Sequence, residues 1–154
     1  MINDPVQVAI AGAKQDKIVV DALVRKSNRI LASITTHKFP LDLFPDSINV
    51  EEGRVTVIVR NFFWSSQIYS VDIKNIANVL LNTAPFFAQL VIVSKTFAEN
   101  EIRVNSLWIK QAIYVRRLIE GLRVLESNQV DTSVYTKREL IGKLEALSST
   151  ETVT

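Results

Sequence analysis

The first regular pattern along the chain is an apolar repeat at three- and four-residue steps. It comprises Val19, Val20, Leu23, Ile30, Leu31 and Ile34, with charged residues between them. This period is typical of an amphipathic helix. We therefore expect a helix over residues 16–37, preceded by a flexible leader over residues 1–15. Pro40 and Pro45 should end it, because a proline ring forces the residue before it into extended backbone.

Between Ile48 and Val104 the pattern changes to short alternating segments. In "RVTVIVRNFF" the side chains of Val55, Val57 and Val59 would share one face of a strand. The preceding "EEG" predicts a turn in which Gly53 can take a positive φ. The expected strands are "INV", "RVTVIVRNFF", "SQIYSVDI", "IANVLLN", "QLVIVSK" and "EIRV". Such a series predicts an antiparallel meander that closes into a barrel or sandwich.

The helical period returns after Asn105 and Ser106, which are suitable N-cap residues. The apolar stripe that follows is Trp108, Ala112, Val115, Leu118, Ile119, Leu122 and Leu125. It predicts a long helix that buries one face against the strands. In the tail, residues 127–154, Thr136 and Glu139 form a capping-box pattern that predicts a short helix at about residues 137–147.

Two segments carry a resemblance to a known family. "SLWIKQAIYVRRLI", Ser106 to Ile119, resembles the closing helix of pleckstrin-homology (PH) domains, and Trp108 stands where that family has a tryptophan packed on the barrel. "VDIKNIANVLLNTAPFFAQLVI", Val71 to Ile92, resembles the middle strands of bacterial PH-like proteins. The resemblance covers about residues 44–126.

The resemblance implies an α+β, mainly β, fold. A PH-like domain over residues 38–126 would be an antiparallel strand barrel or sandwich capped by a C-terminal amphipathic helix. The extra N-terminal helix and the short C-terminal helix lie outside that unit. The bacterial relatives are largely uncharacterised interaction domains, so the resemblance implies a bacterial, cytoplasmic binding module.

One departure from the family concerns lipids. Members that bind phosphoinositides resemble one another in a Lys/Arg-rich turn between the first two strands. Here that turn is Glu51 to Gly53, which is acidic where a phosphate group requires cations. The resemblance therefore does not imply lipid-headgroup binding.

Composition and charge narrow the classes of protein further. The 154 residues include no cysteine, which is compatible with the cytoplasm, and the formal charge is only +2 without a basic cluster, so we expect no nucleic acid partner. The uncharged run from Asn75 to Ser94 contains Pro85 and several amides, which argues against a transmembrane span. The N-terminus lacks the basic region of a signal peptide.

The sequence offers little catalytic chemistry. His37 is the only histidine, and we expect it to cap a helix end. Asp42 and Asp46 are typical of a turn rather than of an acid–base pair. The four glycines are too far apart for a phosphate-binding loop. We therefore predict that the protein is not an enzyme and has no catalytic residue, no metal site and no cofactor.

The stretch "NFFWSS", Asn61 to Ser66, is the best candidate interaction surface. If the strand alternation continues, Phe63 points inward while Phe62 and Trp64 point outward beside Arg60. Either the leading helix or the tail covers these rings, or they form an exposed aromatic tip. "APFFAQL" offers a second aromatic pair, Phe86 and Phe87, of which one ring would point inward and the other outward by the same reasoning. Trp108, in contrast, is expected to plug the barrel.

Two hypotheses of function follow for these six residues, Arg60, Phe62, Phe63, Trp64, Phe86 and Phe87. The first is a non-enzymatic PH-like module for protein–protein interaction or self-association with an unknown partner, because aromatic residues are enriched at interface hot spots. The alternative is peripheral binding to a membrane surface through Phe62 and Trp64, because aromatic rings also settle at membrane–water boundaries. A small-molecule or enzymatic role for the barrel interior ranks last.

Overall fold

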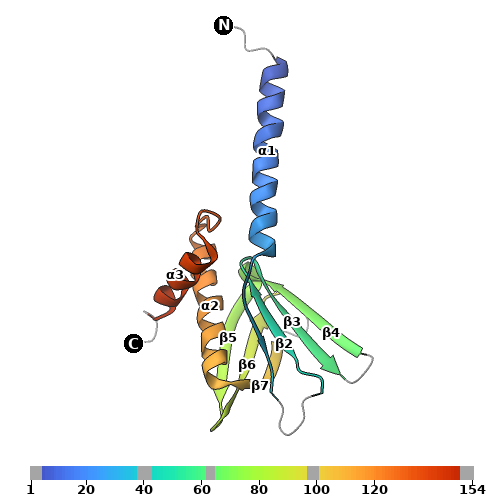
Figure 1. The fold of residues 1–154 in the computed structure, drawn as a ribbon, viewed down its shortest axis with the longest axis vertical. Helices are drawn as coiled ribbons and strands as arrows, with labels where there is room; N and C mark the ends of the chain where they lie inside the picture. Colours follow the sequence, from blue (N-terminus) through green and yellow to red (C-terminus); the bar gives the residue numbers. More distant parts are fainter. Residues whose placement is uncertain (1–4, 38–42, 62–64, 97–100, 150–154) are drawn as a thin grey trace.

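The described residues form two antiparallel sheets, three α-helices and one 3-10 helix (Figure 1). The computed structural model describes residues 5–37, 43–61, 65–96 and 101–149. Within them, one sheet has the order β1-β2-β3-β4 and the other β5-β6-β7. The elements are α1 (Pro5–Asn28), β1 (Ile30–Thr35), β2 (Ser47–Glu51), β3 (Arg54–Asn61), β4 (Ser65–Asp72), the 3-10 helix η1 (Ile73–Asn75), β5 (Ile76–Thr83), β6 (Phe87–Ser94), β7 (Glu101–Trp108), α2 (Ile109–Ser127) and α3 (Lys137–Ser149).

The strands from β2 to β7 lie where the alternating pattern predicts them. On β3, Val55 and Val57 are buried and Val59 is half-buried, while Arg54 and Arg60 are exposed. The predicted α+β class is therefore confirmed: antiparallel strands are closed by a C-terminal helix. The expected positive φ at Gly53 is wrong, since no glycine in the described segments has one.

Helix α2 closes the strand unit with the face that the sequence predicts. Its buried residues are Ala112, Val115, Leu118, Ile119, Gly121 and Leu122. Two arginines beside this face donate to backbone carbonyls of β5: Arg116 Nε to Val79 O at 3.2 Å, and Arg123 Nη2 to Ala77 O at 2.7 Å. These bonds satisfy acceptors on an edge strand, which protects that edge from pairing with another chain.

Helix α3 packs on α2 through Leu140 and Leu144, both fully buried. A Cβ built at Gly121 would lie 2.9 Å from Leu144 O, so the glycine allows the two helices to approach closely. The predicted capping box is confirmed, because Glu139 Oε2 accepts from Thr136 N–H at 2.9 Å and Glu139 N–H donates to Thr136 Oγ1 at 3.3 Å.

The N-terminal third differs from the sequence prediction. Helix α1 covers residues 5–28, so the expected leader is largely helical, and the expected helix over residues 16–37 is wrong after Asn28, because Ile30–Thr35 is strand β1. The register of β1 on β2 shifts between Ile30 and Ala32, which leaves Leu31 as an extra residue. Leu31 and Ile34 are therefore both buried at a three-residue step, a spacing that imitates a helix.

The chain direction gives the barrel two distinct ends. Strand β1 leaves the base of α1, and antiparallel pairing then reverses the chain at each connection (Figure 1). The far end, opposite α1, consequently holds the ends of β1 and β3, the starts of β2 and β4, the β5–β6 turn and the start of α2. The near end holds the base of α1, η1 and the α2–α3 connection.

Candidate functional site

The far end carries a group of aromatic rings, which we call the aromatic group: His37, Phe86, Phe87 and Trp108. Phe86 is 73% exposed in the turn between β5 and β6, and a bond from Ala84 N–H to Phe87 O, 2.8 Å long, closes that turn. Phe87 is half-buried, so the pair has one exposed ring and one partly buried ring, as expected.

Trp108 joins the other rings of the aromatic group. It is paired with Phe87 across β6 and β7, and their ring centroids lie 5.0 Å apart at an interplanar angle of 33°. The ring centroid of His37 lies 5.8 Å from that of Trp108, at an interplanar angle of 48°. These separations are those of favourable aromatic contacts.

The predicted role of Trp108 as a barrel plug is wrong, because 45% of this residue is exposed. The cause is a bulge in β7. Ala88 pairs with Leu107 and Leu90 with Val104, so Asn105 and Ser106 together oppose Gln89 alone. The extra residue turns Leu107 inward and Trp108 outward.

Ser106 has a φ of 61°, a left-handed value that a serine rarely adopts. Its carbonyl accepts from His37 N–H at 2.9 Å.

Two predicted capping roles are not found. Asn105 and Ser106 are part of strand β7, so their expected N-cap role is wrong, since α2 begins at Ile109. The expected helix-capping role of His37 is also wrong, since no helix ends there.

Of the other predicted site residues, the structure describes only Arg60. Arg60 is exposed at the end of β3, and its N–H donates to Asp46 Oδ1 at 2.9 Å, so Asp46 orders backbone rather than acting as an acid. Phe62, Phe63 and Trp64 lie outside the described residues, as does Asp42. The fold brings this end of β3 and the β5–β6 turn to the same end of the barrel.

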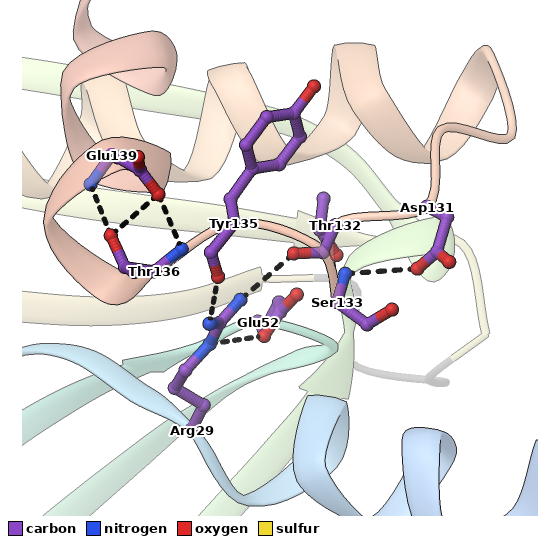
Figure 2. A network of polar contacts seen from close by, with 8 residues as sticks. All are labelled: Arg29, Glu52, Asp131, Thr132, Ser133, Tyr135, Thr136 and Glu139. Carbon is purple, nitrogen blue, oxygen red and sulfur yellow. Dashed lines mark hydrogen bonds and ion pairs between the residues drawn. The ribbon is translucent and has the colours of Figure 1, made fainter. Parts of the chain in front are cut away.

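The near end holds a polar network that joins three parts of the chain (Figure 2). Arg29 Nε donates to Glu52 Oε2 at 2.7 Å, and the two remaining nitrogens of the guanidinium donate to the carbonyls of Tyr135 and Thr132, at 2.6 and 3.1 Å. The Glu52 side chain is 1% exposed. Arg29 therefore ties the base of α1 to the barrel and to the α2–α3 connection.

Helix α1 exposes a second apolar surface, far from the aromatic group. Eight of its large apolar side chains are between 49% and 61% exposed: Val6, Val8, Ile10, Ile18, Val19, Val20, Leu23 and Val24. Figure 1 shows the helix standing away from the two sheets, with only its last turns beside them.

Two open hollows lie at the near end. One, of about 550 Å³, lies between α1 and the α2–α3 connection and is lined by Val19, Leu23 and Val130, among others. The other, of about 520 Å³, lies between η1 and the end of α2; its lining mixes cations such as Lys74 and Lys95 with the carboxylates of Glu120 and Glu126. Because positive and negative side chains line the same hollow, it does not favour a ligand of either charge.

The described part of the chain shows no cluster of three or more metal-ligating side chains.

Two side chains in it have pKa values that are shifted further from neutral pH. Burial, and secondarily the Glu145 carboxylate, raise the pKa of Tyr114, while the backbone and side-chain hydrogen bonds of Thr136 lower the pKa of Glu139. Neither change produces a general acid or base that is active near pH 7.

Among the described helices, none has a stretch that is both long and apolar enough to cross a bilayer.

Comparison with known proteins gives limited information. No protein-family model matches the chain, and no curated protein matches it. Among solved structures, it is similar to a DUF1696 family protein with a pleckstrin-homology domain from Shewanella loihica, with a TM-score of 0.43 and 11% sequence identity, over 70% of this chain and 92% of that chain. A likeness at this level carries no argument about the function of this chain.

Proposed function

We propose that this chain is a non-enzymatic PH-like binding module that contacts a partner protein through the aromatic group at the far end of the barrel. The observation that carries the proposal is the outward position of Trp108, whose ring contacts those of Phe87 and His37, with the exposed Phe86 adjacent to Phe87 in the chain. Large rigid rings bury much apolar area at a low cost in side-chain entropy, and they dominate binding energy at protein interfaces.

The surroundings of His37 support a binding role rather than catalysis. Its ring contacts Trp108, its backbone N–H is bonded to Ser106 O, and the aromatic rings beside it supply no nucleophile. A histidine that acts as a base requires a reacting group within hydrogen-bond reach and a second group to orient it.

The proposal can be tested by quantitative affinity capture from the extract of cells that naturally make the protein. Phe86→Ser and Trp108→Ser should each lose the captured partner. Ile68→Ser is the matched control, because Ile68 on β4 is 66% exposed and does not belong to the aromatic group. Capture that all three variants retain equally would contradict the proposed surface.

A second arm tests the membrane alternative with vesicles of phosphatidylglycerol and phosphatidylcholine. The proposal predicts that the native chain stays in the supernatant and that its tryptophan emission does not shift. Salt-sensitive pelleting that Trp108→Ser abolishes would instead show that the aromatic group binds a lipid surface.

A further inference from the structure

Helix α1 has more exposed apolar surface than a solitary helix can sustain in water. All of its eight exposed large apolar residues except Leu23 are β-branched. Such residues have below-average helix propensity, and isolated helices are only marginally stable, so most helical stability comes from packing of an apolar face. Its own barrel covers only the last turns (Figure 1).

One face of α1 has the spacing of a helix-pairing seam. Val8, Gly12, Gln15, Val19 and Ala22 follow one another at steps of four, three, four and three. This 3.5-residue period keeps a set of side chains facing a second helix. A Cβ built at Gly12 would meet no atom within 4 Å, so the space beside this glycine is open to a close neighbour.

The two halves of this face are complementary to each other. The first half of the helix, residues 5–13, has no charged residue. In the second half, Ile18, Val19, Ala22 and Leu23 form the apolar wall of the 550 Å³ groove. The wall opposite combines Val130 with polar residues, namely Glu126, Gln129, Asp131 and Ser133. A slim, uncharged helical segment can lie along the apolar wall of this groove, and the chain itself contains one.

The direction of pairing follows from the shape of the molecule. The α2–α3 connection stands beside the base of α1 on the groove side, as the lining of the groove shows. A parallel partner would bring a second barrel to that position and collide with it. An antiparallel partner brings the thin N-terminal half of its α1 instead.

From these observations we infer that a second copy of this chain docks antiparallel along α1, with the N-terminal half of each helix in the groove of the other copy. The seam then sets Val8 of one copy against Val19 of the other, and Gly12 against Gln15 near the two-fold axis. The interface is isologous, so each contact occurs twice and the assembly closes as a dimer.

Sedimentation equilibrium of the full chain tests the dimer. The native protein should have twice its chain mass of 17.3 kDa. Val19→Asp should raise the dissociation constant by on the order of tenfold or more, because it places a carboxylate beside Glu126 and Asp131 in both grooves. Ile68→Asp, on an exposed position of β4, should leave the dimer intact. A native chain of single mass, or a Val19→Asp variant that remains dimeric, would overturn the inference.

Cysteine cross-linking tests the direction, because the chain contains no native cysteine. Val8→Cys and Val19→Cys proteins that differ in tag length should form mixed disulfide dimers under mild oxidation. Same-variant dimers in excess would refute the antiparallel register. Phe86→Ser should dimerise normally, since the aromatic group lies at the other end of the barrel, so this inference and the proposed function can fail separately.

Discussion

The rings of Phe87 and Trp108 lie 5.0 Å apart on the outside of the sheet, although simple alternation from Val104 would turn Trp108 into the barrel. The bulge at Asn105 and Ser106 produces this inversion. The surface that we propose for binding thus depends on one residue with a left-handed backbone.

The first prediction concerns that residue. Ser106→Val should reduce the free energy of unfolding by about 1–3 kcal/mol, because a β-branched residue is strained at a φ of 61°. Ser106→Gly should be neutral or stabilising, since glycine adopts this conformation without strain. Urea denaturation measures both. Equal stability of the two variants would argue against a left-handed residue 106.

The second prediction concerns the ion pair at the base of α1. Arg29→Met leaves the Glu52 carboxylate, 1% exposed, without its cation, and should cost about 3–5 kcal/mol. The double variant Arg29→Met with Glu52→Leu should recover much of this loss. Thermal unfolding at pH 7 measures both variants.

The control for that pair is Arg103→Ala. Arg103 and Glu101 form an ion pair at 2.6 Å, but their side chains are 63% and 42% exposed. Its removal should cost at most about 1 kcal/mol. If Arg29→Met were as mild as this control, the network in Figure 2 would not hold the near end together.

The third prediction compares two helical glycines. Gly121→Ala should destabilise the protein by about 1–3 kcal/mol, because the added methyl group meets the Leu144 backbone and must push α3 away. Gly142→Ala meets no atom within 4 Å and should instead stabilise α3 by up to about 1 kcal/mol, the difference in helix propensity. Chemical denaturation of both variants checks whether the changes have opposite signs.

The fourth prediction is a pH dependence of α3. The hydrogen bonds of Thr136 lower the pKa of Glu139 in the folded chain, so folding favours the carboxylate form. This contribution is present above the unfolded pKa of about 4.3 and is lost as the pH falls through the lower folded pKa. The protection of the Thr136 amide against hydrogen exchange, relative to its intrinsic rate at each pH, should therefore fall in that acid range. Glu139→Gln should remove this pH dependence, and a variant that kept it would point to another group.

The sequence predicts well the elements whose side chains follow an uninterrupted period. Strands β2 and β3 and helix α2 bury their apolar residues at regular steps, as at Val55 and Val57, so the pattern alone locates them. The capping box of Thr136 and Glu139 is a local signal of the same kind.

The pattern misleads where a bulge adds one residue. Leu31 and Ile34 are both buried because the extra residue in β1 lets two side chains that are three positions apart face the core. This three-residue spacing is also typical of the buried face of a helix. Ser106 has the same effect on Trp108 in β7. Neither bulge follows from local composition, because each depends on pairing with a strand elsewhere in the chain.

The sequence predicts the candidate site only in part. Its pattern identifies Phe86 and Phe87 as aromatic residues at a turn, but the contact of Trp108 with His37 joins positions 71 residues apart. The pattern misses the first half of α1, because the mostly small, uncharged residues there give no amphipathic contrast.

The most direct test of the proposed binding surface is photo-cross-linking in living cells. A photoreactive phenylalanine derivative at position 86 is compared with the same group at position 68, which is exposed but remote from the aromatic group. We expect a discrete protein adduct from position 86 and none from position 68. If position 86 gives no protein adduct while position 68 does, the aromatic group is not the surface through which this chain binds its partner.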